Sequence, residues 1–190
     1  MTRFVRTLGL CSFLLVVALN TSTAPVHAFD EIADAQKAIL EMAKEIEAGK
    51  DVSSQAAALK KKLEDLAPLM AAYKPKARKG IGVGSGKDGV ESKFIALGKR
   101  ATAAILTMEK DDLIKMGYVN LAIGETTLHF APEKPKGGKG KAEWVKHTKE
   151  MIEATKEFIE AVKGGNAAKV KSAANNVNNA CNNCHSDFRD

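Results

Sequence analysis

Residues 166–189 read NAAKVKSAANNVNNACNNCHSDFR, and this stretch decides how the rest of the chain is interpreted. Asn166 follows Gly164-Gly165 and is a favourable N-cap, so a helix is predicted to begin here. Its apolar residues recur at alternating steps of three and four, the a/d pattern of a helix packed in a bundle. These residues are Ala167, Val170, Ala174, Val177, Cys181, Cys184 and Phe188. The last helix is therefore predicted to be buried along one seam that contains two cysteines.

The motif Cys181-Asn182-Asn183-Cys184-His185 predicts a haem c attachment site. Two thiols at this spacing add across the two vinyl groups of one porphyrin, and the imidazole that follows becomes the proximal iron ligand. On a helix the two cysteines share a face, and His185 lies one turn beyond Cys181. We therefore predict one covalent haem c on Cys181 and Cys184, with His185 as the proximal axial ligand of the iron.

Two other interpretations of the cysteine pair are weaker. A structural zinc site needs a second pair of ligands, for which the chain after residue 28 offers only His129 and His147 outside the motif. A thioredoxin-like redox dithiol needs a βαβ context, and the sequence shows none.

The N-terminus is typical of an exported protein. Arg3 and Arg6 precede an apolar run, Leu8–Leu19, that is short for a membrane span, and Val26-His27-Ala28 is a plausible cleavage site. An uncleaved anchor is the alternative. We predict a signal peptide over residues 1–28, a single domain over 29–190 in the periplasm, and no membrane span after cleavage. Cys11 leaves with the signal, so both remaining cysteines belong to the haem motif.

The charge excludes one class of partner. Removal of Arg3 and Arg6 lowers the formal net charge from +6 to +4, and haem propionates lower it further. Such a surface indicates solubility and not nucleic-acid binding.

The remaining composition predicts an all-α protein: an antiparallel four-helix bundle with an extra helical insertion between the second and third core helices. The first helix is expected from an Asp30 N-cap to Gly49. The second is expected from Asp51 or Ser53 to Tyr73, with a kink at Pro68, and to form an antiparallel hairpin with the first.

The insertion covers residues 74–141. It is predicted to contain flexible loops rich in Gly and Lys, a short helix over 91–100, and a longer one over 109–130 in which Gly117 and Gly124 permit close approach to a neighbour. The glycine-rich loop 80–86 lacks the features of a nucleotide-binding loop, because no strand precedes it and Asp88 follows Lys87. A third core helix begins near Trp144 and ends at Gly164.

The chain resembles the cytochrome c prime superfamily, best over residues 143–190. The resemblance is carried by Trp144 at the start of a core helix, the Gly-containing turn 164–166, the Cys-x-x-Cys-His motif, and the pair Phe188-Arg189. It implies an antiparallel four-helix bundle, haem on Cys181 and Cys184, His185 as proximal ligand with Arg189 one turn away, and a homodimer through the first hairpin.

The sixth iron ligand stays open. Low-spin relatives take a methionine from early in the first helix, where this chain has Ile32, Ala35 and Ile39. The other candidates are Met42, Met70, Met116, His129 and Met151, and for each of them the pattern favours core packing over iron ligation.

Two functions follow, and neither makes the protein an enzyme. The first is single-electron transfer to redox partner proteins in the periplasm. The second is binding or sequestration of a small diatomic gas such as nitric oxide by a high-spin haem. A peroxidase needs a distal acid–base residue, which only His129 and His147 suggest, and no motif supports either of them.

Overall fold

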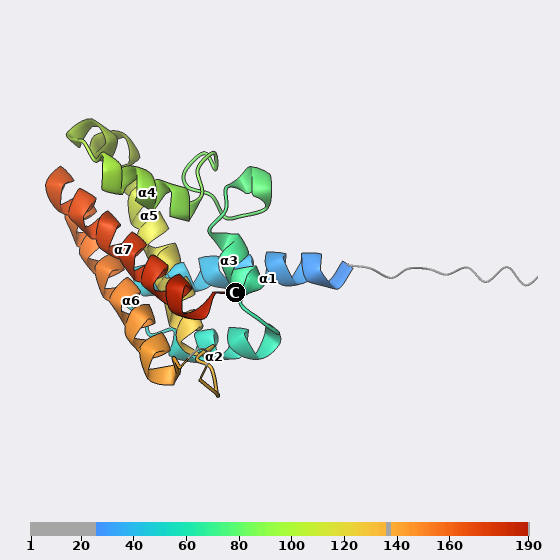
Figure 1. The fold of residues 1–190 in the computed structure, drawn as a ribbon. Helices are drawn as coiled ribbons and strands as arrows, with labels where there is room; N and C mark the ends of the chain where they lie inside the picture. The colour runs from blue at the N-terminus through green and yellow to red at the C-terminus, as the bar shows by residue number, and fades with distance from the viewer. Residues whose placement is uncertain (1–25, 136–137, 190) are drawn as a thin grey trace, which may run out of the picture.

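The computed structural model describes residues 26–135 and 138–189, in which every regular element is helical apart from one isolated bridge between Val83 and Asp88 (Figure 1). The predicted all-α class, with extra helices between the second and third expected core helices, is confirmed. The elements in chain order are α1 (Val26–Glu47), α2 (Ser53–Lys62), α3 (Ala67–Ala72), the 3-10 turn η1 (Lys76–Arg78), α4 (Val90–Lys99), α5 (Ala103–Leu128), α6 (Lys141–Lys163) and α7 (Ala167–Phe188). The predicted signal peptide lies outside the described residues except for its last three.

The main helical layer is formed by α5, α6 and α7. The helix α6 packs against α5 on one side and α7 on the other, and α4 covers α7 (Figure 1). The α5–α6 contact is close because two glycines of α5 face α6: a Cβ on Gly117 would lie 2.4 Å from Ile159 Cγ1, and one on Gly124 would lie 2.7 Å from Ile152 Cγ1. The predicted close approach at these two glycines is confirmed.

The N-terminal helices pack against α5. The helix α1 contacts α5 and α3 and has a smaller contact with α2, whereas α2 mainly contacts α5. Buried side chains of this layer include Ala35, Ile39, Leu59 and Leu69. The segment 74–141 therefore contributes α5 to the centre of the molecule, between the N-terminal helices and the α6–α7 pair.

Three predicted helix boundaries were wrong. The helix α1 begins at Val26 and not at Asp30, since neither Gly nor Pro interrupts residues 26–30. The expected helix over 51–73 is two helices, because α2 ends at Lys62, Leu63 is extended, and Pro68 lies in the first turn of α3, where its missing N–H costs nothing. The helix α5 begins six residues earlier than expected, because Thr102 caps it by accepting a hydrogen bond from the Ile105 backbone N–H at 3.3 Å.

Backbone hydrogen bonds hold the glycine-rich loop between α3 and α4. The Val83 N–H donates to the Asp88 carbonyl at 2.9 Å, and the Ile81 N–H donates to the Ala72 carbonyl at 3.1 Å. Gln36 of α1 donates from its side-chain amide to the Lys79 carbonyl at 2.6 Å. These bonds bring the start of α4 next to the end of α3, where a Cβ on Gly89 would lie 2.3 Å from the Tyr73 carbonyl oxygen.

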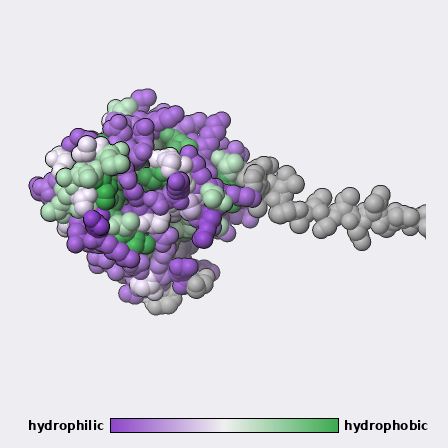
Figure 2. Space-filling view, turned by 90° about the horizontal axis from the view of Figure 1, so that it is seen from above, coloured by the Kyte–Doolittle hydropathy of each residue, from purple (hydrophilic) through white to green (hydrophobic). Residues whose placement is uncertain are grey.

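The surface is mostly hydrophilic. Figure 2 shows charged and polar residues over most of one face, with apolar residues gathered on its left-hand part. Met108, 84% exposed, and Leu40, 41% exposed, are the large apolar side chains most open to solvent among the described residues. Within residues 26–135 and 138–189, none of the helices combines the length and apolar character that a membrane span needs.

Candidate haem attachment site

The three residues of the motif lie in the last two turns of α7. Cys181 and Cys184 are both free thiols and both half-buried, and Cys181 packs against the hydrophobic core. His185 is exposed, and its backbone carbonyl accepts a hydrogen bond from the Arg189 N–H at 3.0 Å. The helix therefore presents the thiols towards the protein and leaves the imidazole accessible, with Arg189 one turn away as expected.

The start of α6 fixes the end of α7. Trp144 and Phe188 pack edge to face with ring centroids 5.0 Å apart, and the Trp144 indole N–H donates to the Thr127 carbonyl of α5 at 2.8 Å. His147 Nε2 lies 2.9 Å from Asp187 Oδ2, and this pairing lowers the pKa of Asp187. These contacts hold the helical turn that carries the motif against α6.

The helix α4 runs along α7 towards the cysteines. The Asn175 side-chain amide donates to the Gly98 carbonyl at 3.1 Å, so the end of α4 meets the first half of α7. A Cβ on Gly98 would lie 2.3 Å from Asn175 Oδ1, which shows how closely the two helices approach. Because the helices pack side by side, the start of α4 lies near Cys181, and the charge of Glu91 contributes to raising the pKa of that thiol.

Burial raises the pKa of Cys181 to about 12 and also raises the pKa of Cys184. The neighbouring thiol contributes to the first shift and Asp187 to the second. The thiolate is the reactive form of cysteine, so both thiols are poorly nucleophilic in the folded, haem-free chain.

A chain of hydrogen-bonded polar groups, here called the Tyr73 network, runs from the half-buried Tyr73 into the core between α3, α5 and α6. The Tyr73 hydroxyl donates to Asn120 Oδ1 at 2.8 Å, and Asn120 Nδ2 donates to Thr155 Oγ1 at 2.7 Å. The Thr155 hydroxyl donates to the Met151 carbonyl at 2.7 Å, and Met151 Sδ lies 3.7 Å from the Tyr73 oxygen. Asn120 and Thr155 are completely buried.

The Tyr73 network adjoins the cysteine motif. Burial holds the pKa of Tyr73 well above its usual range, and charge on Cys181, on Glu91 and on Cys184 raises it further. The carbonyl of Tyr73 lies against Gly89, one residue before α4, and α4 leads along α7. Two separate observations therefore place Tyr73 beside the thiol-bearing face of α7.

The sequence analysis did not identify the Tyr73 network. Tyr73 ends the second expected helix, and Asn120 lies between the apolar residues Val119 and Leu121. An asparagine inside an apolar helical run is a usable signal, because a buried amide needs hydrogen-bond partners.

Ala35 and Ile39, which stand where low-spin relatives have a methionine, are fully buried, and their helix α1 packs on α5 and α3. Among the candidate sixth ligands, Met42 belongs to the α1–α2 contact and Met116 is core in α5, while His129 is exposed. His147 is hydrogen-bonded to Asp187, and Met70 is half-buried in α3. Met151 is the candidate that contacts the Tyr73 network.

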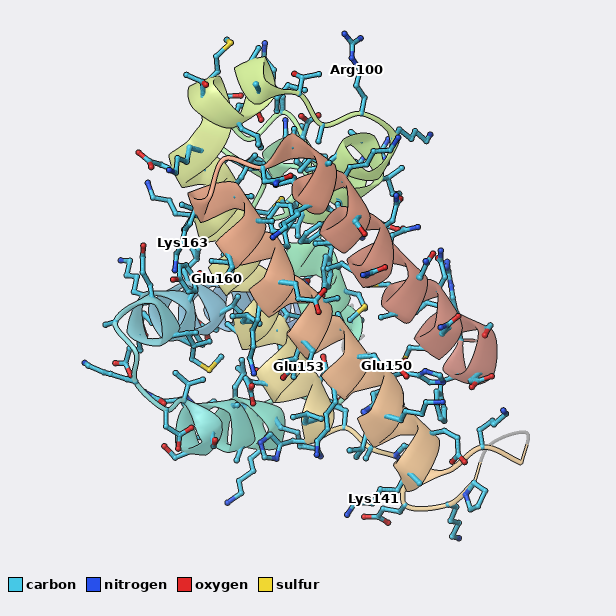
Figure 3. The ribbon with its side chains drawn as sticks, turned by 90° about the vertical axis from the view of Figure 1, so that its left-hand side faces the viewer. Arg100, Lys141, Glu150, Glu153, Glu160 and Lys163 are labelled. Carbon is cyan, nitrogen blue, oxygen red and sulfur yellow. The ribbon has the colours of Figure 1, made fainter. Side chains whose placement is uncertain are left out.

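A polar groove of about 430 Å³ lies on the outer side of the α6–α7 pair. Its lining residues are Glu150, Glu153, Ala154, Glu157, Asn176, Asn179, Ala180 and Asn183. Figure 3 shows Glu150, Glu153 and Glu160 along the exposed side of α6, with Lys141 and Lys163 at its ends. Lysines pair with two of the lining glutamates: Lys146 Nζ lies 3.9 Å from Glu150 Oε1, and Lys156 Nζ lies 2.8 Å from Glu153 Oε1.

The donor set fits a covalent haem and not a metal cluster. Two free thiols on one helical face, followed directly by an accessible imidazole, are what thioether attachment and proximal ligation require. The described ranges contain no group of three or more His, Cys, Asp or Glu side chains that could hold a metal ion.

Residues 133–189 match the family model of Cytochrome C'. The resemblance to the cytochrome c prime superfamily is thereby confirmed over this region, which comprises α6, α7 and the residues just before them. This family consists of haem-binding c-type cytochromes that are generally not enzymes. No curated protein and no solved structure matches the chain. The Cytochrome C' region contains the whole motif, together with Trp144, His147, Asp187 and Phe188.

Proposed function

We propose that the protein is a periplasmic c-type cytochrome that carries one haem c and transfers single electrons. The proposal rests on one observation above all: the Cytochrome C' match covers an α7 whose two free thiols share the core-facing side and precede an exposed imidazole. Cys181 and Cys184 would form the thioethers, and His185 would be the proximal ligand. The haem would supply the one-electron chemistry between ferric and ferrous iron.

The rest of the chain would position the group and exclude water. The contacts of Trp144 with Phe188 and of His147 with Asp187 hold the turn of α7 that bears the motif. The half-buried thiols direct the porphyrin towards the core, whereas His185 would bind from the more exposed side. Burial of most of the ring in apolar surroundings is the ordinary means by which a protein controls haem potential and ligand access.

A second candidate function is the binding of a small gas by a five-coordinate iron. It is favoured by the position of the candidate sixth ligands: Met42, Met116 and His129 belong to contacts or surfaces away from the thiols. Met151 remains the competitor, because it lies in the Tyr73 network.

The optical spectrum of the ferric holoprotein tests the choice between these functions. A low-spin spectrum with a methionine–iron charge-transfer band that disappears in Met151→Ala would support simple electron transfer. A high-spin spectrum that is unchanged in Met151→Ala would support gas binding. Met42→Ala is a matched control, since Met42 is equally buried but lies in the α1–α2 contact.

The partners follow from the same proposal. An electron carrier needs a redox protein that approaches the end of α7, where the exposed His185 lies. The export signal expected in residues 1–28 and the family both support a periplasmic location. Sedimentation of the holoprotein tests the homodimer that the resemblance implies.

A further inference from the structure

The Tyr73 network places hydrogen-bonding groups at one point between three helices. Tyr73 directly follows α3, Asn120 belongs to α5 and Thr155 to α6, and these elements are separated in sequence. A buried polar group costs free energy unless it is paired, and here the fully buried Asn120 and Thr155 and the half-buried Tyr73 are paired with one another.

The network adjoins the side of α7 on which the thiols lie. The Tyr73 carbonyl lies against Gly89, the residue before α4, and charge on either thiol raises the pKa of Tyr73. Met151 of the same network is on α6, the helix that packs against α7. A haem attached to Cys181 and Cys184 on this side would approach the Tyr73 hydroxyl, whereas His185 is exposed. The phenol is therefore a candidate for the side of the iron opposite the imidazole.

The network can release a proton donor by a half-turn of one side chain, with no change in the backbone. In the present arrangement the Tyr73 hydroxyl donates to Asn120 Oδ1, and Asn120 Nδ2 donates to Thr155 Oγ1. A half-turn of the Asn120 carboxamide exchanges its oxygen and nitrogen. The Thr155 hydroxyl would then turn from the Met151 carbonyl, which keeps its helical N–H partner, and donate to Asn120 Oδ1. Asn120 Nδ2 would donate to the Tyr73 oxygen, and the Tyr73 proton becomes available to a ligand.

We propose that the Tyr73 hydroxyl determines which ligand the iron binds, by donating a hydrogen bond to a small diatomic molecule whose outer atom becomes partly negative when bound. Nitric oxide and dioxygen belong to this class, whereas carbon monoxide gains less from a donor. Asn120 and Thr155 are positioning residues that supply the reversible partner for Tyr73. The inference rests on the proposed function, because it requires the haem on Cys181 and Cys184.

The test uses full-length holoprotein and the Tyr73→Phe variant, which removes only the hydroxyl. Tyr118→Phe is the matched control, because Tyr118 is the other tyrosine and lies near Lys163 at the far end of α6. In the ferrous carbonyl complex, the infrared C–O stretch should move to higher wavenumber in Tyr73→Phe and stay in place in Tyr118→Phe. The preference for nitric oxide over carbon monoxide should fall about tenfold in Tyr73→Phe, equivalent to about 1.4 kcal/mol, the size of one hydrogen bond.

The outcomes separate the two proposals. If the haem extracts from the wild-type protein, the proposed function fails and this inference fails with it. If the haem is covalent but Tyr73→Phe leaves the C–O band unchanged, or if carbon monoxide does not bind, only the inference is overturned. A shift of equal size in Tyr118→Phe also overturns it. If Tyr73→Phe folds poorly, the wild-type protein provides a second test. Its C–O band should shift when H₂O is replaced by D₂O, because the ligand contacts an exchangeable proton, and an unshifted band overturns the inference.

Discussion

Trp144 at the start of α6 and Phe188 at the end of α7 pack edge to face, with ring centroids 5.0 Å apart. They are more than forty positions apart in sequence, yet they flank the turn that holds the Cys-x-x-Cys-His motif. The Trp144 indole N–H also donates a hydrogen bond to the Thr127 carbonyl of α5. This pair therefore connects three helices at the proposed haem site.

The Trp144–Phe188 pair should contribute a measurable coupling energy. Trp144→Ala removes a buried aromatic side chain and should lower the free energy of unfolding by about 3–5 kcal/mol. Phe188→Ala should cost less, because Phe188 is half-buried. In a double-mutant cycle monitored by urea denaturation, the coupling should be about 0.5–1.5 kcal/mol. Additive effects of the two substitutions would show that the rings merely lie close together.

Gly117→Ala should destabilise the protein although alanine is the better helix former. The new Cβ would lie 2.4 Å from Ile159 Cγ1, and overpacking of this kind costs about 1–3 kcal/mol, against a gain of about 1 kcal/mol in helix propensity. We expect a net loss of up to about 2 kcal/mol in chemical denaturation. Adding Ile159→Ala removes the clashing atoms, so the double variant should lose less than the sum of the single losses. Full additivity would contradict the close α5–α6 contact.

Glu143 should contribute stability that depends on pH. The Gly140 backbone N–H donates to Glu143 Oε2 at 3.0 Å, and this bond lowers the pKa of the carboxyl group. A group with a lowered folded-state pKa stabilises the protein above its unfolded pKa, and the contribution disappears as the pH falls through the folded value. Glu143→Ala should therefore lower the thermal midpoint at pH 7, and its difference from the wild type should shrink as the pH falls below the ordinary glutamate pKa of about 4.3. Glu157→Ala serves as the control on the same helix. A difference for Glu143→Ala that persists at low pH would argue against this assignment.

The haem-free protein should be much less stable than the holoprotein. The buried side of α7 consists of small residues, Val170, Ala173, Ala174, Val177 and Ala180, so its apolar burial without haem is limited. Thermal denaturation of the holoprotein and of Cys181→Ala/Cys184→Ala, followed by far-UV circular dichroism, measures the difference. Equal midpoints would mean that the α6–α7 contact is sufficient by itself.

Much of the helical layout could be predicted from residue periodicity. The seam of α7 and the stripe of α6 are regular because each helix packs against neighbours along one side, and Gly164-Gly165 separates them cleanly. The second expected helix was wrong because an apolar stripe continues through Leu63 and Leu66, although the backbone breaks there. Periodicity records which side chains are buried and does not record a break in the backbone between them.

The attachment motif could be predicted from sequence because the chemistry of haem attachment fixes the spacing of Cys181, Cys184 and His185. The surroundings of the motif could not be predicted, because they depend on contacts between α3, α5 and α6. Nothing local in the sequence pairs Tyr73 with Asn120, 47 positions later.

The covalent attachment of haem is the central claim, and acid–acetone extraction tests it most directly. Protein matured in the periplasm should retain its haem on the polypeptide after extraction, and its intact mass should exceed that of the chain by one haem. Cys181→Ala and Cys184→Ala should each lose one thioether and shift the reduced pyridine-haemochrome band. Haem that extracts completely from the wild-type protein, with a mass equal to the bare polypeptide, would contradict the account.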